Sequence, residues 1–231
     1  AIPEDVPFLR LLALLIQDLG RGPLKATATG NLPLKVVKAA AEVWSADLTD
    51  KEKSRFSRIR SENDFPSLHV VRLVACMGGF IRKRHQRFCL TKRGEKVLSD
   101  GIGGKAFLRL FENYNRKFNW GYRDWYPELD IVQRSAFFAL YMLQKFGGEE
   151  RPVSFYEGKF LAAFPMAVRE VPEREYRSRE ETVRQCFNLR VMRKFAHFLG
   201  FMEYVEEQKE IPSWERDETV RKTSFLDAWI R

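Results

Sequence analysis

The chain has 231 residues, of which 45% are hydrophobic and 31% charged, the balance of a globular protein with one large domain or two ordinary ones. No apolar run approaches the roughly 20 residues of a membrane-spanning helix, and the acidic Glu4 and Asp5 stand where a secretory signal has basic residues. The cysteines are odd in number and scattered through apolar stretches: Cys76, Cys89 and Cys186. We therefore expect a cytoplasmic protein with reduced thiols and no membrane association.

The net charge of +9 is concentrated in the first half of the chain. Residues 1–104 carry 18 Lys and Arg against 11 Asp and Glu, a net charge of +7, whereas residues 105–231 carry 22 against 20, a net charge of +2. Such a basic excess favours a polyanionic partner such as nucleic acid.

Hydrophobic spacing and turn residues predict the elements of the first half. The expected order is helix, short strand, helix, helix, then two strands joined by a turn, and a closing helix that Thr91 caps. A polar stretch from Trp44 to Asn63 is predicted to be mainly loop. The element ranges are Pro7–Leu19, Leu24–Thr29, a helix through Val36 and Val43, Leu68–Met77, Phe80–Arg84, Arg87–Leu90 and Lys92–Leu98.

The segment that contains the two paired strands resembles the winged-helix superfamily. Its residues run from Gly79 through a basic turn to Leu90, Thr91 and Gly94. The resemblance implies a helix-turn-helix variant whose β-hairpin, the wing, contacts DNA.

The second half repeats this plan. Helices are predicted over Ile131–Phe146, Val153–Phe164 and Glu180–Leu199, and Gly200-Phe201 follows the last helix as Gly79-Phe80 follows the earlier one. The predicted fold is therefore mainly α with small β-hairpins (α+β), arranged as two winged-helix-like domains in tandem.

We expect the first domain at residues 1–104, an aromatic linker at 105–126 and the second domain at 127–231. The glycine-rich stretch from Ser99 to Gly104 predicts the boundary there or just after the helix that follows. The segments Thr27–Pro33 and Phe118–Trp120 also resemble a family of bacterial winged-helix proteins, a resemblance that implies no activity.

The residue types that catalysis needs are not brought together by any motif. The three histidines have no cysteine or carboxylate partner at metal-ligand spacing, and neither a phosphate-binding glycine loop nor a nucleophile elbow occurs. We therefore expect a protein that is not an enzyme and has neither cofactor nor metal.

The turn between the two strands is the first candidate site, since long cationic side chains on a hairpin can lie along a phosphate backbone. The alternative interpretation is a solvated hairpin edge protected by its charges. The preceding helix offers Arg72 for a base contact, and the third helix of the second half offers further groups beside acidic Glu180 and Glu181. The candidate DNA-binding residues are Arg72, Arg82, Lys83, Arg84, His85, Arg87, Arg184, Asn188, Arg193 and Lys194.

Aromatic and basic residues alternate between Asn113 and Tyr126. They predict either a stacking platform for single-stranded nucleic acid or aromatic contacts that attach a linker to its neighbours. Taken together, the sequence favours a double-stranded-DNA-binding protein with a role in transcription regulation. The alternative is a protein-protein interaction module that uses the same units as a scaffold.

Overall fold

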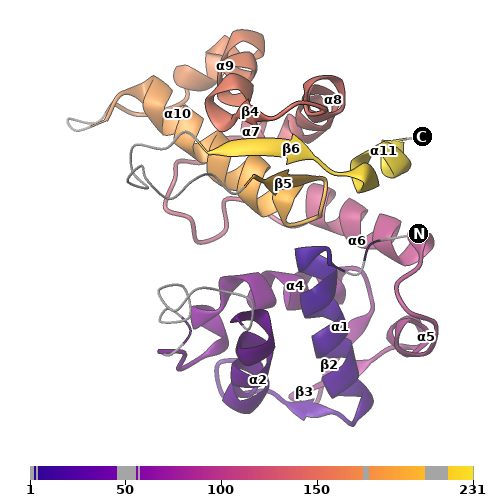
Figure 1. Cartoon of the computed structure of the whole chain (residues 1–231). Helices are drawn as coiled ribbons and strands as arrows, with labels where there is room; N and C mark the ends of the chain where they lie inside the picture. Colours follow the sequence, from indigo (N-terminus) through magenta and orange to yellow (C-terminus); the bar gives the residue numbers. More distant parts are fainter. Residues whose placement is uncertain are drawn as a thin grey trace. The chain divides into compact units, whose positions relative to one another are not determined.

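The computed structural model describes residues 3, 5–45, 56, 58–173, 177–205 and 218–230. The chain divides into two compact units, residues 1–118 and 119–231 (Figure 1). Each unit consists of helices and one three-stranded antiparallel sheet, so the predicted mainly α fold with small β-hairpins is confirmed. Part of the predicted loop at 44–63 and the residues between the last two strands lie outside the described residues.

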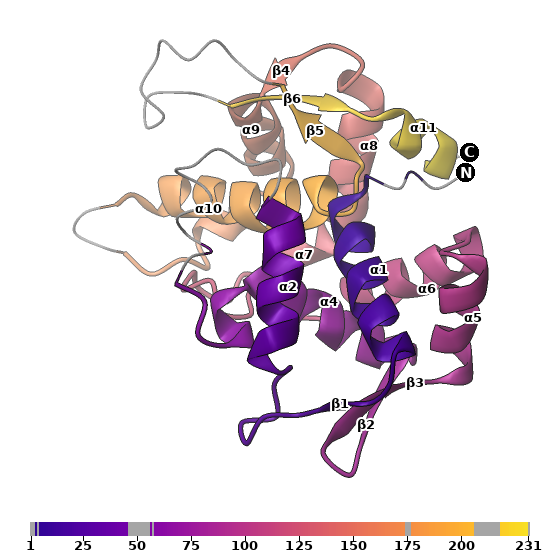
Figure 2. The same cartoon turned by 60° about the horizontal axis from the view of Figure 1, so that its bottom comes forward.

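The first unit follows the predicted order, with one additional short 3-10 helix. A buried stripe along the first helix, from Phe8 to Leu19, packs against the fourth helix and the sheet. The elements are α1 (Pro7–Gly20), β1 (Leu24–Lys25), α2 (Leu34–Ser45), η1 (Glu62–Asp64), α4 (Pro66–Met77), β2 (Ile81–Arg84), β3 (Arg87–Leu90), α5 (Lys92–Asp100) and α6 (Gly104–Arg116). Figure 2 shows the β2–β3 hairpin projecting from these helices, with β1 beside it.

After a short leading helix, the second unit repeats the order of the first unit from its first helix to the helix after the hairpin. The helix before the hairpin continues as a π-helix, and the described residues of this unit contain no counterpart of α6. The predicted helix over Ile131–Phe146 is broken at Ser135, whose hydroxyl group donates to the Val132 carbonyl oxygen at 2.8 Å. The elements are α7 (Asp130–Arg134), α8 (Ala136–Phe146), β4 (Arg151–Pro152), α9 (Val153–Ala163), η2 (Pro165–Val168), α10 (Arg179–Phe187), the π-helix η3 (Asn188–His197), β5 (Met202–Tyr204), β6 (Thr219–Lys222) and α11 (Ser224–Ile230).

The two sheets share one topology. Their strand orders are β1-β3-β2 and β4-β6-β5, and all pairs are antiparallel. In each unit a short strand thus pairs with the second strand of the hairpin.

A threonine latch closes the base of each hairpin. Gly79 and Gly200 have φ angles of 70° and 78°, a left-handed conformation that favours glycine and ends the preceding helix. The Thr91 hydroxyl group donates to the Gly79 carbonyl oxygen at 2.7 Å. In the second unit, the Thr223 hydroxyl group donates to the Gly200 carbonyl oxygen at 2.6 Å. Thr91 also caps α5, as predicted, by accepting from backbone N–H groups of the first turn. The correspondence seen in the sequence between the two glycines therefore extends to the contacts around them.

The predicted linker at 105–126 is not a separate segment. Helix α6 packs on α4 and belongs to the first unit because its apolar stripe, which includes Phe107 and Tyr114, is buried there. The division falls between Phe118 and Asn119, after the helix that follows the glycine-rich stretch, so residues 119–126 belong to the second unit.

Candidate nucleic-acid interface

Four cations share one face of the first sheet. The register pairs Arg84 with Arg87 and Lys25 with Arg87, and Arg82 lies two residues before Arg84 on β2. Because directly paired residues, and residues two apart on a strand, point to the same side, these four side chains lie together. We call Lys25, Arg82, Arg84 and Arg87 the cationic face.

The cationic face is exposed and carries no acidic partner. All four side chains are exposed. Within the described part of the chain, no carboxylate lies within ion-pair distance of any of them. The opposite side of the sheet carries Ile81, Phe88 and Leu90, which are buried. The sheet is therefore held by its apolar side while its charges remain available to a polyanion.

Lys83 lies on the other side from the cationic face, because strand residues alternate. Its ammonium group sits 5.8 Å from the centre of the Phe88 ring and approaches Gly30 of the neighbouring loop. Lys83 is exposed but forms a separate basic position at the edge of the sheet.

The turn of the hairpin is strained. His85 and Gln86 have φ angles of 47° and 54°, and both side chains are exposed. Two consecutive positive φ angles match a type I′ turn, in which Asn-Gly is favoured. Side chains other than glycine cost on the order of 1 kcal/mol each in this region. His85 therefore points outward from a two-residue tip that has a defined shape.

Arg72 is not available for a base contact, contrary to the prediction. Its Nε donates to the Glu62 carboxylate at 2.6 Å, and the His69 ring nitrogen lies 3.0 Å from the same oxygen. The backbone N–H of Leu32 donates to the other oxygen. All three side chains are buried because the helix turns its polar groups toward the acidic residue of η1. Burial acts to raise the pKa of Glu62, but the hydrogen bond from His69 and the charge of Arg72 outweigh it and hold that pKa below its usual value.

The corresponding face of the second sheet is neutralised by acids. Arg221 on β6 is paired with Glu203 on β5, at 2.8 Å, and also lies 3.7 Å from Glu150. Counting from the glycine before each hairpin, Arg82 and Cys89 of the first sheet stand at the positions of Glu203 and Arg221. The two sheets therefore share a topology but differ in charge on this face.

The predicted cations of the second unit are also paired. Arg184 donates to Glu180 at 2.7 Å, and Arg193 donates to Glu218. Lys194 donates to Asp124. The Asn188 side-chain oxygen is buried without a hydrogen-bond partner in the described part of the chain. The three cations are therefore already paired with acidic side chains. This does not support the prediction of a DNA-contacting surface formed by Arg184, Asn188, Arg193 and Lys194.

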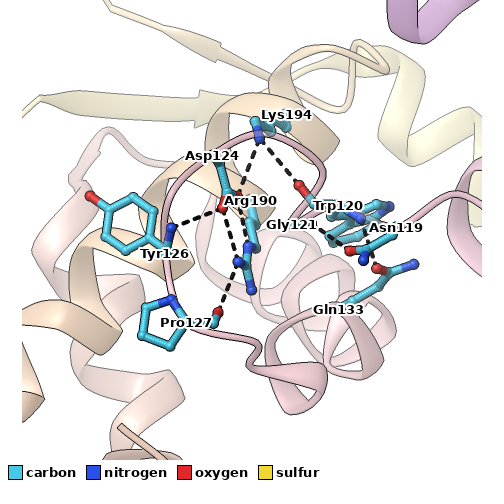
Figure 3. Close-up of polar contacts among 9 residues, drawn as sticks. All are labelled: Asn119, Trp120, Gly121, Asp124, Tyr126, Pro127, Gln133, Arg190 and Lys194. Carbon is cyan, nitrogen blue, oxygen red and sulfur yellow. Dashed lines mark hydrogen bonds and ion pairs between the residues drawn. The ribbon is translucent and has the colours of Figure 1, made fainter. Parts of the chain in front are cut away.

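Asp124 organises the loop before α7, as Figure 3 shows. Its carboxylate accepts from Arg190 at 2.8 and 3.0 Å, from Lys194 at 3.3 Å and from the backbone N–H of Tyr126 at 3.1 Å. Arg190 also donates to the Pro127 carbonyl oxygen at 3.0 Å. Burial acts to raise the pKa of Asp124, but the hydrogen bonds from Arg190 and the charge of Lys194 outweigh it and lower that pKa.

This loop exposes a tryptophan. Arg123 and Trp125, on either side of Asp124, have φ angles of 59° and 63°, a conformation that persists only where the surroundings enforce it. The Trp125 side chain is 95% exposed, whereas Trp120 is fully buried and stacks on Phe195 at 4.6 Å.

Of the other aromatic residues predicted as a stacking platform, Tyr114, Phe118 and Trp120 are core residues, whereas Tyr122 is exposed and Tyr126 is half-buried. Tyr114 and Phe118 are buried in the first unit, with ring centres 5.5 Å apart. Burial raises the pKa of Tyr114 far above its usual value. Of the two alternatives for this segment, attachment to the neighbouring cores accounts for Tyr114, Phe118 and Trp120.

Sequence reasoning missed Lys25 and Glu62. Lys25 follows Leu24 in a stretch that alternates apolar and polar residues, and that alternation is the signal that could have placed it on an outer face. Glu62 stands in a stretch without periodicity, so nothing nearby indicates that it is fully buried.

The described residues contain no group of three His, Cys, Asp or Glu that could hold a metal ion. Cys76, Cys89 and Cys186 are unbridged. None of the described helices combines the length and apolar character that crossing a membrane requires.

Comparison with known proteins identifies a relationship for one unit. Residues 4–102 match the family model described as the Y4jL N-terminal domain. The match extends through α5 and stops before α6, so it covers the first unit, which carries the cationic face, except for α6, and it includes none of the second unit. No curated protein and no solved structure matches the chain.

Proposed function

We propose that the protein binds double-stranded DNA by placing the cationic face against its phosphates. The observation that carries this proposal is that Lys25, Arg82, Arg84 and Arg87 lie on one sheet face without an acidic partner among the described residues. Grouped guanidinium and ammonium groups attract phosphates and release their counterions. His85 is exposed at the strained turn beside this face and is not counted among the four phosphate contacts.

Two other features support the proposal. The net charge of residues 1–104 is +7, so the field of the first unit attracts a polyanion. In addition, the order of helix, strand, helix, helix and hairpin agrees with the winged-helix resemblance of the sequence, and we propose that each unit is a winged-helix domain. Transcription regulation is the use that we propose for this binding.

The experiment is a salt titration of the affinity for a mixed-sequence DNA duplex, measured by fluorescence anisotropy. With four phosphate contacts, raising the salt from 50 to 200 mM should lower the wild-type affinity about 150-fold, since each contact contributes a slope of about 0.9. The triple variant Arg82→Ala, Arg84→Ala, Arg87→Ala retains one contact, and the same change of salt should lower its affinity only about 3.5-fold.

A matched control removes the same charge elsewhere. Lys145, Lys159 and Arg169 are exposed residues of the second unit that form no ion pair with a described carboxylate. Their triple alanine variant should keep the wild-type slope. Equal slopes for the two triple variants would show that net charge alone matters, and absence of wild-type binding at low salt would refute the proposal.

A second candidate function, a protein-interaction module, is favoured by Trp125. A tryptophan that is 95% exposed, on a loop fixed by the buried Asp124, has the character of an interaction hot spot. Under this alternative, a purified partner should lose affinity at least tenfold for Trp125→Ala. Tyr141→Ala, at a side chain that is 56% exposed, should leave that affinity unchanged.

A further inference from the structure

We infer that the cationic face binds DNA duplexes without reading their base sequence, an inference that rests on the proposed function. It depends on two independent observations, the side chains that α4 turns to solvent and the width of the sheet. Both concern the surface of the first unit where a helix-turn-helix protein would read bases.

Helix α4 offers almost no group that recognises a base edge. Its long polar side chains, His69 and Arg72, are buried on Glu62. Its exposed residues are Pro66 and Met77. The half-buried positions of this helix are Ser67, Val70, Leu73 and Cys76.

Bases in the major groove are distinguished by arginine, lysine, amide, carboxylate and hydroxyl groups. Ser67 is the only partly exposed polar side chain of α4. A helix with an apolar outer side and one short hydroxyl group could not distinguish the four base pairs, whatever its distance from the groove.

The sheet itself is too wide to enter a groove. A two-stranded ribbon fits the major groove, which is about 12 Å wide. Here β1 joins the hairpin next to its turn, where Lys25 pairs with Arg87 and Arg87 pairs with Arg84. Three backbones at about 4.8 Å spacing span about 10 Å before any side chain is added. The cations therefore meet the duplex from outside, at its phosphates.

The geometry decides what the face contacts. It consists of three arginines and one lysine, groups that can bind a guanine edge inside a groove or a phosphate outside it. Because the sheet stays outside the grooves, the contacts are to phosphates, which carry no sequence information. The structure therefore assigns the site a ligand class, double-stranded DNA of any sequence.

The test uses the full chain and a library of randomised 20-base-pair duplexes, with selection at low salt followed by affinity measurements on individual duplexes. We expect no enriched motif and affinities that agree within threefold between AT-rich and GC-rich duplexes. An enriched motif, or a preference above tenfold, would overturn the inference while leaving the proposed function intact. Failure to bind any duplex at low salt would overturn both.

A pair of variants tests the role assigned to α4. Ser67→Glu places a negative charge on the helix, and Ala162→Glu places one on an exposed position of the second unit. If α4 stays out of the groove, the two variants should lower the duplex affinity equally, within twofold. A loss of more than tenfold for Ser67→Glu alone, with a wild-type circular dichroism spectrum, would overturn the inference.

Discussion

Replacing Asp124 with asparagine should destabilise the second unit by about 3–5 kcal/mol. The carboxylate accepts two hydrogen bonds from Arg190, one from Lys194 and one from the backbone of Tyr126. The Arg190 side chain is only 5% exposed, so the substitution leaves a buried charge without compensation, which costs about 3–5 kcal/mol. The asparagine amide also directs its own donors toward the two cations.

The assay is urea unfolding followed by tryptophan fluorescence, because Trp120 is fully buried on Phe195 in the same unit. A loss of about 4 kcal/mol lowers the midpoint by roughly 2 M for an m value near 2 kcal/mol/M. Glu203→Gln is the matched control. It makes the same acid-to-amide change against Arg221, but both side chains of that pair are about half exposed, and such pairs contribute less than about 1 kcal/mol. If Asp124→Asn costs no more than Glu203→Gln, the cluster does not stabilise the unit and the argument is wrong.

Three further predictions concern the turn, the half-buried His197 and the threonine latch. The double substitution His85→Asn, Gln86→Gly should stabilise the first unit by about 0.5–1 kcal/mol in thermal unfolding, because asparagine and glycine adopt positive φ angles readily. Destabilisation by this double substitution would contradict the strain assigned to the turn. Burial lowers the pKa of His197, so its contribution to stability is complete above the ordinary value near 6.5 and is lost as the pH falls through the lower value of the folded state. The second unit should therefore unfold at lower urea at about pH 5.5 than at about pH 7.5, and an equally large difference in His197→Gln would exclude this histidine as the cause. Thr91→Val should lower the free energy of unfolding of the first unit by about 1–2 kcal/mol, because it removes both the latch and the cap of α5. Thr29→Val, at an exposed hydroxyl group, should lower it by less than about 0.5 kcal/mol. Equal losses for the two variants would argue against the latch.

Local patterns in the sequence predicted most of the fold. The apolar spacing from Phe8 to Leu19, the glycines that end two helices and the cap at Thr91 each act within a few residues, so their structures follow from neighbouring positions. The break at Ser135 was missed because the apolar spacing continues through it, while a side-chain hydrogen bond interrupts the helix.

The candidate site was predicted only in part. The basic hairpin was found because its residues are consecutive. Arg72 was misassigned because the acid that buries it stands ten residues earlier, in a stretch without periodicity. Lys194 was misassigned because its partner, Asp124, is 70 residues away in the chain. Whether a cation is free or paired depends on tertiary contacts, which a list of charged residues does not contain.

The threonine latch also determines how a force on the hairpin is transmitted. Phe80 begins the hairpin and Thr91 ends it, and the two meet through the hydrogen bond from the Thr91 N–H to the Phe80 carbonyl oxygen, at 3.0 Å, beside the one to Gly79. Gly94 lies so close to the Phe80 carbonyl group that no side chain fits between them. The base of the hairpin is therefore attached to both neighbouring helices. A force applied at the tip of the hairpin is transmitted to the last turn of α4 and the first turn of α5 together.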